Sequence, residues 1–273
     1  MSTYRADPKD GVAWITGGST GIGRSVARLL AQQGYTVAVT VRPNDPLDTL
    51  IAETKDMPGR VLSFPSDVTD EAGMAAAVAA IEAQAGPIVL AVLNAGAYMP
   101  VTGDNLCMKA FRQSFAVNVF GVLHGLGPVI DRMRNRGRGH IVFMGSISAY
   151  FGWPTTAAYG STKAAVNIIA EALKFDLDKM NIRTQVMNPG FIDTPLTEKA
   201  SFSMPAMMPV ERAAERICKA IRSSGFEVTF PRRLTWGMKL LFLLPRPIRE
   251  KALVASTRWK REPLVYLRRN SFD

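Results

Sequence analysis

A tyrosine and a lysine four residues apart, Tyr159 and Lys163, are the first residues whose types and spacing could do chemistry. Side chains at positions i and i+4 share one face of a helix. A lysine ammonium beside a phenol favours the phenolate, so we expect it to lower the tyrosine pKa and ease proton transfer near neutral pH. Ser146, thirteen residues upstream, could hold a carbonyl oxygen next to the phenol. The pair alone is weak evidence, because an amphipathic helix with an exposed lysine has the same pattern.

A strand, a glycine-rich loop and a helix near the N-terminus predict a nucleotide site. Residues 11–16 form an apolar run, and the helical pattern after the loop stops at Gly34. Gly17 permits a tight turn, Gly21 lets the backbone approach a pyrophosphate, and Gly23 allows close packing of helix on strand. The free N–H groups of the helix N-terminus would face the phosphates. We therefore assign cofactor contacts to Gly17, Ser19, Thr20, Gly21, Ile22 and Gly23.

The end of the second strand, residues 35–41, should select the cofactor. An acidic side chain there binds the ribose hydroxyls of NAD, whereas an arginine accommodates the 2′-phosphate of NADP. The closing residues are Val41 and Arg42, with no acid. This favours NADP(H) and leaves NAD(H) open, because Asp45 follows shortly after.

Further cofactor contacts are predicted where later strands end. Asp67 could meet the adenine edge or cap a helix over residues 71–85. The amide of Asn94 could tie strands together, and Thr194 could bond a nicotinamide carboxamide. The residues assigned in this way are Asp67, Val68, Asn94, Ala95, Gly96, Pro189, Gly190, Ile192 and Thr194.

Strand and helix patterns alternate along the chain. They predict an α/β fold, a doubly wound (Rossmann-like) parallel sheet of about seven strands with helices on both faces. A long helical pattern over residues 108–134 has Asn118 in its middle, where an asparagine can locally break the helix. Ser146 follows the fifth strand, at the edge where ligands sit in such sheets. The predicted strands are residues 11–16, 35–41, 60–65, 88–93, 140–144, 183–187 and 226–230.

The composition limits the function classes. We divide the 273 residues into a catalytic domain, 1–230, and an extension, 231–273. Two cysteines and two histidines lie in no metal-like spacing, so we expect neither disulfides nor a metal site, and a cytoplasmic setting. No apolar run reaches the length of a transmembrane helix, and the polar N-terminus is unlike a signal peptide.

The net charge of +10 is concentrated in the extension. Residues 1–230 hold 22 Lys/Arg and 20 Asp/Glu, whereas residues 231–273 hold 11 and 3. The nearly neutral body argues against nucleic acid as a partner. The extension reads as two short apolar helices interleaved with Arg and Lys. Three interpretations stay open: packing over the pocket or on a partner subunit, peripheral contact with a membrane surface, and a partly disordered basic tail.

Taken together, these motifs resemble the short-chain dehydrogenase/reductase family over roughly residues 10–230. Leu93 departs from the family pattern, which usually has a further asparagine there, and we expect a small stability cost without loss of cofactor binding. The extension is a second departure. The residues that carry the resemblance are Thr16-Gly17-x-x-x-Gly21-Ile22-Gly23, Asp67-Val68, Asn94-Ala95-Gly96, Asn118, Ser146, Tyr159-x-x-x-Lys163, Pro189-Gly190 and Thr194.

The resemblance implies an NADP(H)-dependent oxidoreductase that interconverts a ketone or aldehyde and an alcohol. Tyr159 would be the general acid/base, and Ser146 would position the substrate oxygen. Lys163 would lower the Tyr159 pKa and hold the nicotinamide ribose, while Asn118 would anchor a water that links Lys163 to solvent. It also implies a homodimer or homotetramer through the helices that carry Asn118 and Tyr159.

Other functions remain open on the same motifs. They are a non-catalytic NADP(H)-sensing regulatory protein, an NAD-dependent alcohol dehydrogenase, and a lyase or epimerase with bound cofactor. Apolar side chains near the predicted site favour a lipophilic carbonyl or alcohol substrate, such as a steroid-like, fatty or aromatic ketone. Ordinary packing of a mobile lid over residues 196–209 explains them equally well. The predicted substrate residues are Phe151, Trp153, Phe191 and Leu196, with Phe202, Met204, Met207 and Met208 nearby.

Overall fold

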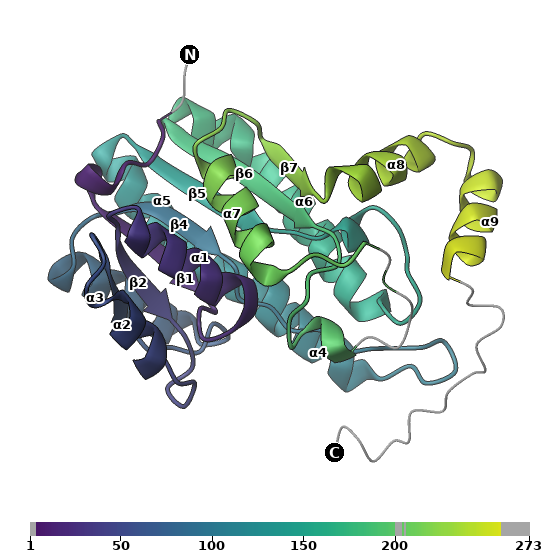
Figure 1. Ribbon diagram of the computed structural model, residues 1–273, viewed down its shortest axis with the longest axis horizontal. Coiled ribbons are helices and arrows are strands. Elements are labelled where there is room, and N and C mark those ends of the chain that lie inside the picture. Colours follow the sequence, from purple (N-terminus) through teal and green to yellow (C-terminus); the bar gives the residue numbers. More distant parts are fainter. Residues whose placement is uncertain (1–3, 200–203, 205, 258–273) are drawn as a thin grey trace.

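A single parallel sheet of seven strands forms the centre of the protein (Figure 1). We describe it from a computed structural model, for residues 4–199, 204 and 206–257. The strand order is β3-β2-β1-β4-β5-β6-β7. Because β1 lies between β2 and β4, the winding direction reverses there, and a crevice forms at the carboxyl ends of β1 and β4. The doubly wound fold and all seven predicted strands are confirmed.

The elements follow the predicted alternation with small shifts at their ends. The strands are β1 Val12–Thr16, β2 Thr36–Thr40, β3 Arg60–Ser63, β4 Ile88–Leu93, β5 Gly139–Met144, β6 Ile182–Pro189 and β7 Glu227–Phe230. The α-helices are α1 Gly21–Gln32, α2 Asp48–Thr54, α3 Glu71–Gln84, α4 Met108–Phe115, α5 Gly121–Arg136, α6 Ala157–Lys179, α7 Val210–Ile221, α8 Arg232–Phe242 and α9 Arg246–Thr257.

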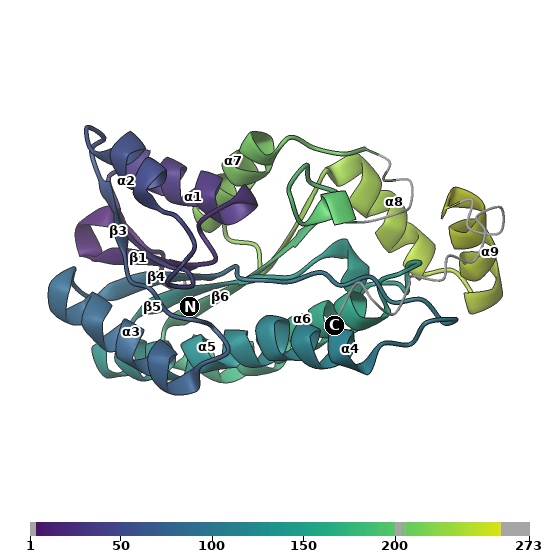
Figure 2. The ribbon, with the colours of Figure 1, turned by 90° about the horizontal axis from the view of Figure 1, so that it is seen from below.

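Helices cover both faces of the sheet, and Figure 2 shows the three layers edge-on. Helices α1, α2 and α7 pack on one face, and α3, α5 and α6 on the other. Strand β1 is buried along its whole length, and its side chains alternate: Ala13 and Ile15 join the first core, Val12 and Trp14 the second. Burial on both faces explains why the strand reads as a continuous apolar run.

Helices α4 and α5 join through a π-helical turn, Ala116–Phe120, into one stretch over residues 108–136. The break lies at Asn118, as the sequence predicts. By length and composition alone this stretch could cross a membrane. Its buried side chains Val122, Leu126, Val129 and Met133 pack beneath the sheet, which makes it a core helix.

Helices α8 and α9 of the extension project from the sheet at the end where the strands carry their carboxyl termini (Figure 1). Met238 of α8 is buried in a cluster with Phe151, Trp153 and Phe191, and Leu253 of α9 packs against it. The packing interpretation of the extension therefore holds for the face of α8 that carries Met238. Residues 258–273, to which the prediction of a disordered tail applies, lie outside the described part of the chain.

Candidate functional site

The glycine loop between β1 and α1 packs directly against the exit of β4. Gly17 has a φ of 71°, a left-handed conformation that favours glycine, and a Cβ there would lie 2.8 Å from the Cα of Ala95. A Cβ on Gly23 would lie 2.1 Å from the carbonyl oxygen of Gly17 and 2.4 Å from Nδ2 of Asn94. The close packing predicted for Gly23 is therefore present, and it brings the N-terminus of α1 to the crevice.

Hydrogen bonds from Asn94 hold the ends of β1 and β4 together. Its Nδ2 donates to the carbonyl oxygens of Thr16 (3.0 Å) and Gly17 (2.8 Å). The Thr16 hydroxyl accepts from the backbone N–H groups of Asn94 (3.0 Å) and Ala95 (3.1 Å). The predicted role of the Asn94 amide in tying strands together is confirmed, and the seam satisfies backbone groups that the crevice would otherwise leave unpaired.

Arg42, at the end of β2, forms a two-pronged ion pair with Asp45. The distances are 3.1 Å from Nε to Oδ2 and 3.0 Å from Nη2 to Oδ1. The arginine side chain is 67% exposed, so a ligand phosphate can reach the guanidinium from solvent. Asp45, the residue that keeps NAD(H) as an alternative, is thus the direct partner of Arg42, the residue that favours NADP(H).

Of the two roles considered for Asp67, the helix cap is filled by another residue, and the adenine contact stays a prediction. Asp70 caps α3, because its Oδ1 accepts from the N–H of Gly73 at 3.0 Å. Asp67 instead accepts from the N–H and the hydroxyl of Thr69, both at 2.8 Å. This local turn leaves Asp67 beyond the end of β3, beside Val68, where the adenine contact is predicted.

Asn118 is buried in the π-helical turn and joins two elements of the site. Its Oδ1 accepts from the N–H of Ala97 (2.7 Å), and its Nδ2 donates to the carbonyl of Ala97 (2.9 Å) and to the Thr162 hydroxyl (3.0 Å). The loop after β4 is therefore fastened to α6 one residue away from Lys163. The structure shows this fastening role, and the water-holding role stays a prediction.

Ser146, Tyr159 and Lys163 meet at the carboxyl end of β5. Ser146 follows the strand, its Oγ accepts from the N–H of Ser148 at 3.1 Å, and its hydroxyl bonds with that of Tyr159. Lys163 donates to the carbonyl oxygen of Met144 at 2.7 Å, and its Nζ lies 5.7 Å from the centre of the Tyr159 ring. Three of the four residues predicted to be catalytic are thus brought together, and the fourth, Asn118, bonds to Thr162 beside Lys163.

Burial dominates the proton affinities of this group. It raises the pKa of Tyr159 to about 12, against the hydrogen bond with Ser146, which lowers it. Burial also lowers the pKa of Lys163 to about 8. The expected lowering of the Tyr159 pKa by Lys163 is therefore wrong for the protein without ligands. The ammonium faces the Met144 carbonyl, and its own burial weakens its charge above neutral pH.

A cavity of about 50 Å³ adjoins Tyr159. Of the predicted substrate residues, Phe191 and Leu196 line it, as does Met204. Phe151 and Trp153 do not line it. They pack edge-on against Phe242 and Phe191, and the ring centroids of Trp153 and Phe191 are 5.8 Å apart. Phe202 lies outside the described residues, Met207 is exposed, and Met208 packs on the core. The cavity is lined by Tyr98, Ser146, Ile147, Ser148, Thr156, Tyr159, Gly190, Phe191, Leu196, Thr197 and Met204.

Tyr98 is a site residue that the sequence analysis missed. Its ring meets that of Tyr159 edge-on, with centroids 5.4 Å apart, and its hydroxyl bonds with that of Thr155 at 2.7 Å. Thr155 has a φ of 61°, which is strained for a β-branched residue. The position of Tyr98 just after the Asn94-Ala95-Gly96 turn, at the ligand edge of the sheet, was the available signal.

Thr194 reaches the glycine loop from the opposite side of the crevice. A Cβ on Gly21 would lie 3.3 Å from the Thr194 methyl group. The Thr194 N–H donates to the hydroxyl of Thr197 at 3.1 Å. Gly190 donates its N–H to the carbonyl of Phe230 at 2.7 Å, which ties the turn after β6 to the end of β7. The turn that holds Pro189, Gly190, Ile192 and Thr194 thus closes the site opposite α1.

A family model described as short chain dehydrogenase matches residues 11–204. The chain belongs to this family. An uncharacterized oxidoreductase of Myxococcus xanthus is 32% identical over 240 residues, 88% of this chain and 95% of the relative. An NADP-dependent (R)-specific alcohol dehydrogenase of Lentilactobacillus kefiri is 33% identical, covering 70% and 76%. The solved structure of a short-chain dehydrogenase from Streptomyces avermitilis, 23% identical, shares the fold with a TM-score of 0.76 over 93% of this chain and 99% of that one.

As a short-chain dehydrogenase, the protein is an oxidoreductase acting on CH–OH or carbonyl groups, in a family that binds NAD(P). The crevice fits such a dinucleotide. A Cβ on Gly96 would lie 3.6 Å from the Lys163 Nζ and 3.5 Å from the Asn118 Oδ1, so glycine keeps space free beside the ammonium. Leu93, the departure from the family pattern, is 1% exposed and packs in the core.

Gly23→Ala should destabilise this short-chain dehydrogenase by about 1–3 kcal/mol, the usual range for overpacking. The added methyl group would press on the Gly17 carbonyl and the Asn94 amide. The matched control is Gly127→Ala in α5, where a Cβ meets nothing within 4 Å, and it should stabilise by about 0.5–1 kcal/mol. Denaturant unfolding measures both. Equal changes in the two variants would contradict the close packing at Gly23.

Proposed function

We propose that this enzyme interconverts a ketone or aldehyde and the corresponding alcohol, with Tyr159 as general acid and base. The observation that carries the proposal is the Tyr159 phenol in the wall of the cavity, hydrogen-bonded to Ser146, with buried Lys163 beside it. The alcohol dehydrogenase activity named for the Lentilactobacillus kefiri relative supports the same reaction class.

Each residue has a task that follows from its chemistry. The nicotinamide, when bound, supplies or accepts the hydride. During reduction the Tyr159 hydroxyl would give its proton to the substrate oxygen while the Ser146 hydroxyl holds that oxygen. Lys163 would hold the cofactor ribose and offset the negative charge left on Tyr159, and Asn118 would keep the loop after β4 in place. A pKa of about 12 keeps the phenol protonated near neutral pH, which favours reduction.

Tyr159→Phe should lower kcat by at least about a hundredfold, the lower end of general acid–base effects, with little change in cofactor affinity. The matched control is Tyr35→Phe, which removes a hydroxyl from a buried tyrosine in another part of the fold. Steady-state kinetics with a panel of ketones and NADPH measures the effect.

The pH profiles of the wild type give a second readout of the same role. Carbonyl reduction should change little between pH 6 and 8, because the phenol stays protonated. Alcohol oxidation needs the phenolate, so its rate should rise as the pH increases toward the Tyr159 pKa of about 12. A Tyr159→Phe variant with near-normal turnover, or with an unchanged oxidation profile, would exclude the role.

We also propose a preference for NADP(H) over NAD(H), read by Arg42. Its exposed guanidinium at the end of β2 supports this choice, while its ion pair with Asp45 lowers the charge available to a 2′-phosphate. The alternative is an NAD-dependent enzyme in which Asp45 binds the ribose hydroxyls. The two alternatives predict opposite effects on cofactor binding when the Asp45 carboxylate is removed.

Fluorescence titration should show NADPH binding at least about tenfold tighter than NADH, which corresponds to about 1.4 kcal/mol. Arg42→Ala should remove this difference. Asp45→Ala should enlarge it, because the guanidinium loses its competing partner. Loss of NADH affinity in Asp45→Ala, with no effect of Arg42→Ala, would instead favour the NAD-dependent alternative.

The substrate is proposed to be lipophilic. Ile147, Phe191, Leu196 and Met204 line the cavity, and these side chains offer mainly apolar contact. Its volume of about 50 Å³ is small beside the roughly 300–1,000 Å³ usual for small-molecule pockets. The side chains of Leu196 and Met204 would therefore move outward when the substrate enters.

A homodimer through α5 and α6 is proposed as the assembly. Phe120, Ile168 and Phe175 are 54%, 64% and 72% exposed on this helical layer, an apolar surface that a second copy would cover. Phe175→Glu should convert the dimer to a monomer in sedimentation velocity. The matched control is Leu240→Glu on α8, where an equally exposed apolar residue lies away from α5 and α6. A monomeric wild type, or a dimeric Phe175→Glu variant, would contradict this interface.

A further inference from the structure

Helix α8 has apolar residues on two opposite faces. Met238 on its inner face is 5% exposed and packs with Leu234 and Leu241 against the Phe191 cluster. Trp236 and Leu240 are 69% and 67% exposed on the outer face. A helix on the surface of a globular protein needs one apolar face for the core, so the second face calls for a different explanation.

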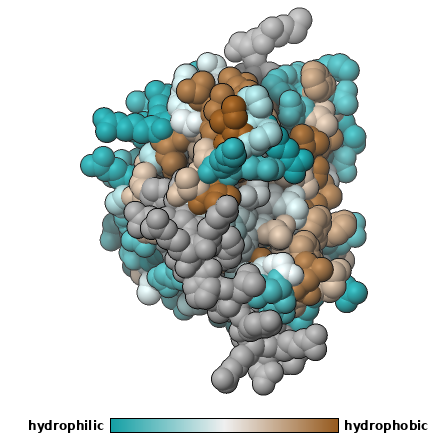
Figure 3. Space-filling view, turned by 90° about the vertical axis from the view of Figure 1, so that its right-hand side faces the viewer, coloured by the Kyte–Doolittle hydropathy of each residue, from teal (hydrophilic) through white to brown (hydrophobic). Residues whose placement is uncertain are grey.

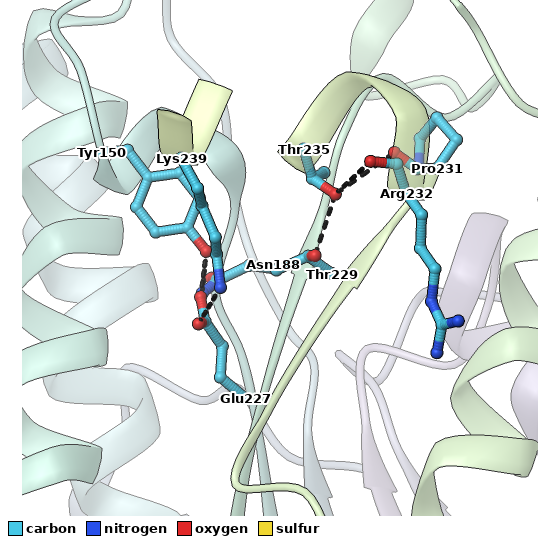
Figure 4. Close-up of polar contacts among 8 residues, drawn as sticks. All are labelled: Tyr150, Asn188, Glu227, Thr229, Pro231, Arg232, Thr235 and Lys239. Atoms are coloured by element: carbon cyan, nitrogen blue, oxygen red, sulfur yellow. Dashed lines mark hydrogen bonds and ion pairs between the residues drawn. The ribbon is translucent and has the colours of Figure 1, made fainter. Parts of the chain in front are cut away.

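The orientation of α8 is fixed by polar contacts with the sheet (Figure 4). Lys239 pairs with Glu227 of β7, which also accepts hydrogen bonds from the Tyr150 hydroxyl and, at 2.9 Å, from the Asn188 amide. The Thr235 and Thr229 hydroxyls bond at 2.9 Å. Burial alone would raise the pKa of Glu227. Lys239, with the largest lowering effect, and the hydrogen bonds from Tyr150 and Asn188 instead lower this pKa below its ordinary value. The carboxylate therefore stays charged near neutral pH, and the contacts keep the outer face turned to solvent.

The outer face continues through the turn into α9. We define the α8–α9 patch as Trp236, Leu240, Leu243, Leu244 and Ile248, which are 69%, 67%, 79%, 41% and 52% exposed. Figure 3 views the molecule from this end and shows apolar residues gathered there beside hydrophilic ones. The patch belongs to a pair of helices that projects from the body (Figure 1), so it is a protruding surface.

Arginine and lysine side chains lie on the same two helices as the patch. Residues 231–257 hold six Lys/Arg and one Asp/Glu. Lys239 and Arg246 are paired with carboxylates, and Arg249 lies over the Phe242 ring at 5.0 Å. Within the part of the chain that the structure describes, Arg232, Arg233 and Lys251 make no ion pair and are exposed. Positive side chains around an exposed tryptophan and leucines match the chemistry of a bilayer surface that carries anionic headgroups.

We propose that the α8–α9 patch binds the surface of an anionic lipid bilayer, with the apolar side chains in the headgroup boundary and the cations at the phosphates. A second copy of the chain fits less well, because a symmetric contact would bring two cationic surfaces together. A protruding surface can insert into a bilayer, whereas a bound peptide would need a groove to lie in. Membrane binding by this patch is independent of the proposed carbonyl–alcohol reaction.

The same helix lies between the bilayer and the cavity. The inner face of α8 packs on Phe191, and Phe191 lines the cavity beside Tyr159. Bilayer contact through the outer face would place the cavity wall next to the membrane. If the proposed lipophilic substrate is correct, this position gives it a short route from the bilayer.

Vesicle sedimentation tests the surface directly. The full-length protein should bind vesicles of 70% phosphatidylcholine and 30% phosphatidylserine, and should not bind pure phosphatidylcholine. The triple variant Trp236→Ser, Leu240→Ser, Leu243→Ser should bind at least about tenfold more weakly. The matched control is Leu106→Ser, an exposed leucine (64%) outside the patch, which should bind like the wild type. Unchanged melting temperatures would establish that both variants fold.

Two further measurements test the contribution of the cations and the depth to which Trp236 enters the bilayer. Replacing Arg232, Arg233 and Lys251 by Gln should weaken binding by about fivefold for each cation, and added salt should release the wild type. In a Trp259→Phe background, brominated lipids should quench Trp236, because Trp14 and Trp153 are 0% and 8% exposed.

The outcomes separate the alternatives. Weakened binding in the triple variant together with quenching of Trp236 supports the bilayer contact. Equal binding of the triple variant and the wild type, or no vesicle binding, overturns it. Self-association that is lost in the triple variant, without vesicle binding, would assign the patch to a second copy. Ketone reduction measured without vesicles tests the proposed function separately.

Discussion

The seam between the ends of β1 and β4 is the constraint on which the site depends. The sheet reverses its winding there, so two strand ends separate and expose backbone groups at the ligand edge. Asn94 and Thr16 satisfy these groups with four hydrogen bonds, and Gly17 and Gly23 let the loop and α1 close over them. A crevice with fixed walls and free N–H groups at a helix N-terminus results, and the other site residues are arranged around it.

Across the crevice, burial sets the chemistry. It raises the pKa of Tyr159 and lowers that of Lys163, so each side chain is shifted toward its neutral form. The hydrogen bond with Ser146 opposes this effect at the phenol, and the Lys163 ammonium donates to the Met144 carbonyl. The space beside Gly96 is where a ligand would add polar contacts, so the proton affinities of the free protein and the loaded enzyme should differ.

The fold and the positions of the proposed catalytic residues could be predicted from the sequence, because hydrophobic periodicity and turn-forming residues are local features. Apolar runs give the strands, and Asn118 marks the break in the helix. The direction of the Lys163 side chain could not be predicted, since it depends on where the end of β5 places the Met144 carbonyl. Phe151 and Trp153 failed as cavity residues for a similar reason. Their partners, Phe242 and Phe191, lie far along the chain, and neither Phe151 nor Trp153 reaches the lining of the cavity.

The extension shows why composition alone left three interpretations open. An apolar, basic segment suits both packing on the body and contact with a membrane. In α8 one apolar face packs on the body, and the opposite apolar face is exposed. The ion pair of Lys239 with Glu227, together with the packing of Met238 in the Phe191 cluster, holds the inner face against the body. Tyr150, which donates to Glu227, lies in the turn that follows Ser146, so this one carboxylate links the substrate side of the site to the helix that carries the patch. The orientation of the exposed apolar face is therefore set by the body of the enzyme.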